Sequence, residues 1–194
     1  MMDYGVTKYD AQVLTDEREI ANWFEETCRG NLHGRPKGFA KKIANWMITE
    51  LLGKIEGNSN LQNDKNFKQK NNIWKLNIKP KQLAKIVILV EEGKISQASG
   101  KELLEMAMEI ESFWPDSKDI EEIIKQKGLE KVSDSGRLEE VVRKVIAANP
   151  KPVADYKAGK KQSIQFLMGQ VMRDTRGKAD VKVVRGILER LLND

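Results

Sequence analysis

The sequence predicts an all-α protein, a multi-helix bundle followed by a small tail domain of three to four helices. Apolar residues recur at three- and four-residue intervals through almost all of the 194-residue chain, the spacing that gives an α-helix one buried face. No stretch alternates apolar and polar residues between turn residues, as a half-buried strand would. Hydrophobic residues make up 40% of the chain, which is enough to bury a core.

The N-terminal part is expected to begin with two helices. Thr15 is followed by two acidic residues, which is typical of an N-cap and first turn, and the helix it starts is expected to stop near Gly30. A turn-rich stretch over residues 30–36 precedes a second helix over residues 39–52. Six asparagines in residues 57–72 then predict a loop.

Three further helices are expected between Pro80 and Gly128. Pro80 suits the first turn of a helix that closes at Gly93. Another helix is expected after Ser99, and a short one should close at Gly128. Two glycines and two serines in residues 128–136 indicate a hinge.

The expected hinge divides the chain into two domains. We expect a helical domain over residues 1–130 and a basic tail domain over residues 131–194. In the tail, one helix should end at Asn149, a second should run from about Lys160 to near Gly177, and a third should start with Asp180 as its N-cap.

The net positive charge of the chain comes entirely from its last 44 residues. Residues 151–194 hold ten basic and five acidic side chains, whereas residues 1–150 hold 24 of each. Several of the basic residues lie where helices are expected to meet, so that backbone N–H groups can also approach phosphate oxygens. The alternative is an ordinary solvated helix surface. The candidate nucleic-acid-binding residues are Lys157, Gly159, Lys160, Lys161, Arg173, Arg176, Gly177, Lys178, Lys182 and Arg185.

The usual catalytic and metal-binding constellations are missing from the sequence. A single cysteine, Cys28, excludes an intrachain disulfide, and a single histidine, His33, cannot build a histidine-rich zinc site. We therefore predict neither catalytic residues nor metal ligands. No segment has the roughly 18 uninterrupted apolar residues of a membrane helix, and we expect a cytoplasmic protein with no membrane partner.

Aromatic residues are scarce in the basic region. The last 44 residues contain only Tyr156 and Phe166, whereas single-strand binding uses aromatics interleaved with basic residues. Contact with the shape and phosphates of a folded RNA therefore fits this composition better than base-by-base recognition.

Three segments of the tail carry a family resemblance: DYKAGK at residues 155–160, FLMGQVM at 166–172 and TRGKA at 175–179. Together they resemble the C-terminal signature of the GatB/YqeY family. Residues 9–15 and 23–26 are similar to a stretch in the B subunit of the aspartyl/glutamyl-tRNA amidotransferases, so the resemblance spans almost the whole chain.

The resemblance implies the C-terminal helical and tail regions of that B subunit, which hold the tRNA. It implies partners in tRNA and in the A and C subunits, and a parent complex that converts Glu-tRNA(Gln) and Asp-tRNA(Asn) to Gln-tRNA(Gln) and Asn-tRNA(Asn). ATP, Mg²⁺ and glutamine would serve that complex, and this chain would hold no cofactor. Two alternatives remain. One is a bundle that docks other subunits. The other is a free-standing YqeY-like protein, because Asp180-Val181 is closer to the sequence of such proteins than to the Asn-Pro that is common in the amidotransferase subunits. An independent enzyme is the least favoured interpretation.

Overall fold

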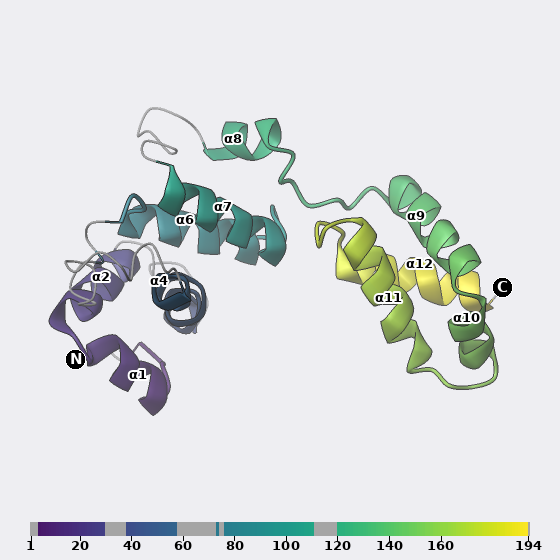
Figure 1. Ribbon diagram of the computed structural model, residues 1–194, viewed down its shortest axis with the longest axis horizontal. Coiled ribbons are helices and arrows are strands. Elements are labelled where there is room, and N and C mark those ends of the chain that lie inside the picture. Colours follow the sequence, from purple (N-terminus) through teal and green to yellow (C-terminus); the bar gives the residue numbers. More distant parts are fainter. Residues whose placement is uncertain (1–3, 30–37, 58–72, 74–75, 111–119, 194) are drawn as a thin grey trace. The chain divides into compact units, whose positions relative to one another are not determined.

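The computed structural model describes residues 4–29, 38–57, 73, 76–110 and 120–193. Within them the all-α prediction is confirmed, since no strand forms and only isolated bridges pair extended segments. Predictions for residues 30–36, for His33 and for residues 58–72 lie outside the described residues. The helices (Figure 1) are α1 (Lys8–Thr15), α2 (Arg18–Cys28), α3 (Phe39–Asn45), the π-helical η1 (Trp46–Leu52), α4 (Gly53–Gly57), α6 (Pro80–Glu91), α7 (Gln97–Glu109), α8 (Ile120–Gln126), α9 (Ser135–Ala148), α10 (Pro150–Lys157), α11 (Ser163–Asp174) and α12 (Val181–Asn193).

The chain forms two compact units. Unit 1 comprises residues 1–91 and 100–117, and unit 2 comprises residues 92–99 and 118–194. The first turn of α7 thus belongs to unit 2 and the rest of that helix to unit 1. The domain boundary expected between residues 130 and 131 stays a prediction.

Unit 1 begins with a helix that the prediction does not include. Thr7 and Asp10 form a reciprocal capping box at the start of α1. The prediction of Thr15 as an N-cap is wrong: Thr15 ends α1 and its hydroxyl donates to the carbonyl of Ala11 at 2.7 Å. The following helix, α2, begins after Glu17, whose side chain makes no capping bond.

The core of unit 1 is built around buried aromatic and aliphatic side chains. Trp23 and Met47 are fully buried, and the expected helix over residues 39–52 is confirmed, with a π-helical second half. A Cβ added to Gly100 would lie 2.8 Å from both Trp46 and Val90. The glycine therefore lets α7 pack closely on α6 and η1.

Two helix starts in the middle of the chain can be compared with their predictions. Pro80 begins α6 as expected. The start expected after Ser99 is wrong by a few residues, because α7 begins at Gln97 and the Ser96 hydroxyl accepts a hydrogen bond from the Ser99 amide at 3.1 Å. Gly128, with φ of 59°, follows α8 as expected.

Unit 2 has a core made by α9, α10, α11 and α12. The prediction does not include α10, which begins at Pro150. Proline suits the first position of a helix, because the N–H that it lacks would have no partner within the helix there. Asp180 caps α12 as predicted: its Oδ1 accepts from the amide of Lys182 at 2.8 Å. The buried core residues of these helices are Leu138, Val142, Val145, Tyr156, Ile164, Leu167, Met168, Val171, Val184, Ile187, Leu188 and Leu192.

The segment expected to be a hinge is paired with other parts of unit 2. Glu130 forms an antiparallel bridge with Ile95, and Val132 forms a parallel bridge with Ala179. The amide of Val132 donates to the carbonyl of Lys178 at 2.8 Å. We call this arrangement of residues 94–95, 130–132 and 178–180 the junction.

Candidate nucleic-acid interface

All ten candidate residues belong to unit 2, and they form two groups at opposite ends of α11. Four of them, from Lys157 to Lys161, lie at the corner between α10 and α11. The other six lie from the last turn of α11 through the turn that follows to the first turns of α12 (Figure 1). Because α11 has 12 residues, the two groups are separated by about 18 Å along its axis.

Backbone hydrogen bonds fix the corner between α10 and α11. The amide of Lys160 donates to the carbonyl of Asp155 at 2.9 Å, and the amide of Gly159 donates to that of Tyr156 at 3.0 Å. This is a Schellman motif, and Gly159 takes its left-handed position with φ of 96°. The glycine is required here by the turn, while its approach to a phosphate stays a prediction.

The lysines at this corner differ in their surroundings. Lys160 pairs with Asp155 at 2.9 Å, which offsets its charge locally. The ammonium of Lys161 lies 4.0 Å from the ring centroid of the buried Tyr156, a favourable cation–π contact. Within the described residues neither Lys157 nor Lys161 forms an ion pair, so both can meet an external anion.

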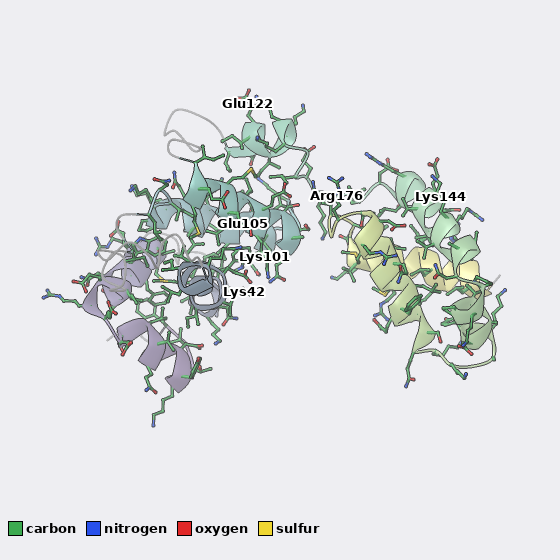
Figure 2. All side chains as sticks on the ribbon, viewed as in Figure 1. Lys42, Lys101, Glu105, Glu122, Lys144 and Arg176 are labelled. Carbon is green, nitrogen blue, oxygen red and sulfur yellow. The ribbon has the colours of Figure 1, made fainter. Side chains whose placement is uncertain are left out.

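A second Schellman motif ends α11, and it places an arginine where glycine is usual. The amide of Gly177 donates to the carbonyl of Met172 at 2.7 Å, and the amide of Arg176 donates to that of Arg173 at 3.0 Å. Arg176 has φ of 52°, and among the described residues it is the non-glycine residue with a positive φ. For an L-residue this conformation costs about 1 kcal/mol. Figure 2 places its side chain at this turn, where it is exposed.

The next two residues of this turn contact the protein itself. Gly177 has φ of 72°, and a Cβ added to it would lie 2.8 Å from the Cβ of Ala98. The ammonium of Lys178 donates to the carbonyl of Gly128 at 2.9 Å. Both residues therefore hold the junction together, and their contact with phosphate stays a prediction.

The remaining candidates lie on exposed helix surface. Arg173 donates to the side-chain carbonyl of Gln170 on the same helix. Lys182 is exposed on the first turn of α12. Arg185 lies 3.9 Å from Glu189, a loose surface pair of little energetic weight.

An ion pair beside the second group is not indicated by the sequence. Lys131 lies 2.7 Å from Asp180, and its hydrogen bond is the main reason why the pKa of Asp180 is lowered. Two backbone amides at the start of α12 also lower that pKa. The sequence could indicate the cap, but not the lysine, because the junction brings Lys131 there through tertiary structure.

The two aromatic residues of the tail differ in their exposure to solvent. Tyr156 is buried, whereas Phe166 is 50% exposed on α11. Helical spacing from Leu167 and Val171, which face the core, could have indicated that Phe166 lies on the outer side. Phe166 is thus an exposed residue close to the candidate set that the sequence reasoning does not include.

Three further features of the described residues concern metal ions, the cysteine and membranes. They contain no group of three or more histidine, cysteine or carboxylate side chains able to hold a metal ion. The thiol of Cys28 is buried, and burial raises its pKa to about 12, which keeps it protonated and unreactive at neutral pH. No helix in the described part of the chain is long and apolar enough to cross a membrane.

Comparison with known proteins identifies the family. The GatB domain model (GatB/YqeY) matches residues 22–192. The chain is 40% identical over 185 residues, 95% of its length, to the B subunit of the aspartyl/glutamyl-tRNA(Asn/Gln) amidotransferase of Carboxydothermus hydrogenoformans. It is 35% identical over 192 residues to the same subunit of Thermotoga maritima, and 37% identical over 190 residues to that of Elusimicrobium minutum. The chain spans 34% to 35% of the length of these relatives. The resemblance seen in the sequence is confirmed: the chain belongs to the GatB domain family.

Proposed function

We propose that this chain is a non-catalytic tRNA-binding part of an amidotransferase B subunit. Its family and the names of its relatives support the amidotransferase context. In the full complex, with the A and C subunits, ATP, Mg²⁺ and glutamine would serve to convert Glu-tRNA(Gln) or Asp-tRNA(Asn) to the amidated product. This chain would bind the tRNA body through the basic residues of unit 2.

The conformation of Arg176 is the observation that carries this proposal. Glycine would occupy the left-handed position at the end of α11 without strain, yet the chain places an exposed arginine there. Within the described residues no carboxylate pairs with this arginine, so its guanidinium is free of a charged partner that would compete with an external anion. Backbone strain of this kind is associated with binding sites, and a guanidinium suits bidentate contact with phosphate.

The surrounding charge supports an RNA phosphate as the partner. From residue 157 to residue 173 the chain contains four basic and no acidic side chains. A carboxylate of α9, Glu139, is bound to Arg143 and Arg190, which lower its pKa. Two arginines of unit 2 thus pair with an acid on α9. Lys157 and Lys161 at one end of α11 and Arg176 at the other form no ion pair within the described residues, so these three can meet a polyanion.

The test is tRNA binding by the Arg176→Gly variant, measured by fluorescence anisotropy across a range of salt concentrations. We expect the variant to be as stable as the parent chain or up to about 1 kcal/mol more stable, because glycine relieves the left-handed strain. We expect its affinity for tRNA to fall about fivefold to tenfold and the salt slope to decrease by about 1.

The matched control is Lys144→Gln, which removes one positive charge from the exposed side of α9 (Figure 2). It should leave tRNA affinity near that of the parent chain. If both variants lose the same small amount of affinity, only net charge matters and the Arg176 contact is wrong. If the parent chain shows no salt-dependent binding of tRNA at all, the proposed function is wrong.

A further inference from the structure

The outer face of α11 carries an exposed aromatic side chain between the two basic groups. Phe166 is 50% exposed, and the core of unit 2 is formed by other residues of the same helix. Arg173 lies two helical turns after Phe166 on the same side of α11, because seven residues complete almost two turns. An apolar ring and a guanidinium are therefore presented together on one side of the helix.

The packing of the described residues does not require a glycine at position 169, one turn after this aromatic. A Cβ added to Gly169 would meet nothing within 4 Å, although glycine in a helix interior destabilises the helix relative to alanine. Gly100 and Gly177 differ, because a Cβ at either would come within 2.8 Å of neighbouring atoms. Gly169 instead leaves bare backbone beside Phe166, where a flat group could approach closely.

The charge of this face indicates what kind of flat group would bind there. Lys157, Lys160 and Lys161 precede α11, and Arg173 lies in its last turn, with no acidic residue between them. Gln170 accepts a hydrogen bond from the Arg173 side chain, which holds the guanidinium along the helix. An apolar spot with basic residues at both ends is complementary to a nucleobase attached to a phosphate backbone.

We infer that Phe166 and Gly169 form a stacking site for one unstacked nucleobase of an RNA loop. The ring of Phe166 would stack on the nucleobase, the backbone at Gly169 would leave room for it, and the basic residues at the two ends of α11 would hold the flanking phosphates. This inference rests on the proposed function and adds to it a preference for RNA with an exposed nucleobase. It also gives Phe166 a role in recognising a nucleobase, whereas the scarcity of aromatic residues in the tail favours contact with the shape and phosphates of the RNA alone.

The experiment compares Phe166→Ala and Gly169→Ala with the parent chain in binding two RNAs. One RNA is an unmodified tRNA transcript, and the other is a blunt RNA duplex without unpaired bases. Loss of one stacked base should weaken tRNA binding by about fivefold or more, while binding of the duplex should not change. Phe166→Trp should bind tRNA as the parent chain does, unlike Phe166→Ala, because any aromatic ring can stack on a base.

Gly169→Ala separates a binding role from a structural one. The substitution should raise the melting temperature by a few degrees, because alanine favours the helix, and it should weaken tRNA binding. The matched control is Gly186→Ala on α12, where an added Cβ also meets nothing within 4 Å. It should raise the melting temperature similarly and leave tRNA binding unchanged.

The outcomes distinguish this inference from the function on which it rests. If both α11 variants bind tRNA like the parent chain while Arg176→Gly binds weakly, the stacking site is wrong and the proposed function stands. If the α11 variants lose tRNA and duplex equally, recognition of an unstacked base is wrong. If they bind tRNA normally but associate poorly with partner subunits, the face is a protein-docking surface and the inference is overturned.

Discussion

Removing the carboxylate of Asp180 tests how the junction stabilises unit 2. This side chain makes two contacts of different kinds. Its Oδ1 accepts hydrogen bonds from the amides of Lys182 and Val183 at 2.8 and 3.4 Å, and its Oδ2 lies 2.7 Å from the ammonium of Lys131. Asp180→Ala removes both contacts, whereas Asp180→Asn keeps an oxygen that can cap α12 and removes the charge.

The expected losses follow from these contacts. An N-cap contributes about 1 kcal/mol, and a partly buried hydrogen bond between charged groups about 1.5 kcal/mol. The side chains of Lys131 and Asp180 are only 26% and 20% exposed, so solvent screens their pair less than it screens most surface pairs. We therefore expect Asp180→Ala to lower the free energy of unfolding of unit 2 by about 2–3 kcal/mol, and Asp180→Asn by about 1–1.5 kcal/mol.

Hydrogen exchange of amides in α9, α11 and α12 measures this free energy for unit 2 alone. Asp174→Asn is the control, because Asp174 is an exposed carboxylate at the end of α11 and its loss should change little. If Asp180→Asn is as destabilising as Asp180→Ala, the cap contributes nothing. If neither variant differs from the control, the reasoning about the junction is refuted.

The same carboxylate predicts a dependence on pH. The pKa of Asp180 is lowered in the folded protein, mainly by the Lys131 hydrogen bond. Its contribution is therefore complete above the unfolded pKa of about 3.9 and is lost as the pH falls from there through the folded pKa. The parent chain should lose its advantage over Asp180→Asn in this acidic range, and an advantage unchanged down to a pH of about 2–3 would contradict this assignment.

Two further predictions concern packing and reactivity. Gly177→Ala should destabilise unit 2 by about 2–3 kcal/mol in urea titrations, because the backbone at Gly177 is left-handed and the added methyl group would collide with Ala98. The control is Gly128→Ala, which should cost only about 1 kcal/mol, because Gly128 has a φ of 59° but open space around it. Equal losses for the two variants would show that the Ala98 contact is unimportant. The thiol of Cys28, with its pKa raised to about 12 by burial, should react with iodoacetamide at about pH 8 only after unfolding in urea, and rapid alkylation of the native chain would contradict its burial.

Apolar periodicity is sufficient for the fold class and for the long helices. The core residues of α11 follow the helical spacing closely, so this helix could be predicted. Two helices that the prediction does not include, α1 and α10, have eight residues each, and their apolar pattern is too short to stand out. Pro150 indicates the end of the preceding helix, but a proline equally suits the first position of the next one.

The sequence predicts which region of the chain carries the candidate site, but not the contacts that its residues make. Counting charges locates the net positive charge in the last 44 residues, because net charge depends only on composition. The predicted helix from about Lys160 to near Gly177 already separates the basic residues into two groups, but nothing in the sequence indicates that Lys178 donates to a carbonyl 50 residues away. Contacts of that kind arise when the junction forms, and no local pattern in the sequence encodes them.

Neighbouring residues of the turn after α11 therefore have opposite energetic effects. Gly177 and Lys178 contact Ala98 and the Gly128 carbonyl, so their replacement should weaken the fold. Arg176 is strained and exposed, so its replacement by glycine should leave the fold equally or more stable and weaken the contact with RNA. On a surface that binds no RNA these two substitutions would change stability in the same way, but Arg176→Gly would weaken tRNA binding no more than the loss of any other exposed charge. Measuring stability and tRNA affinity for Arg176→Gly and Gly177→Ala together thus separates a binding surface from a merely solvated one.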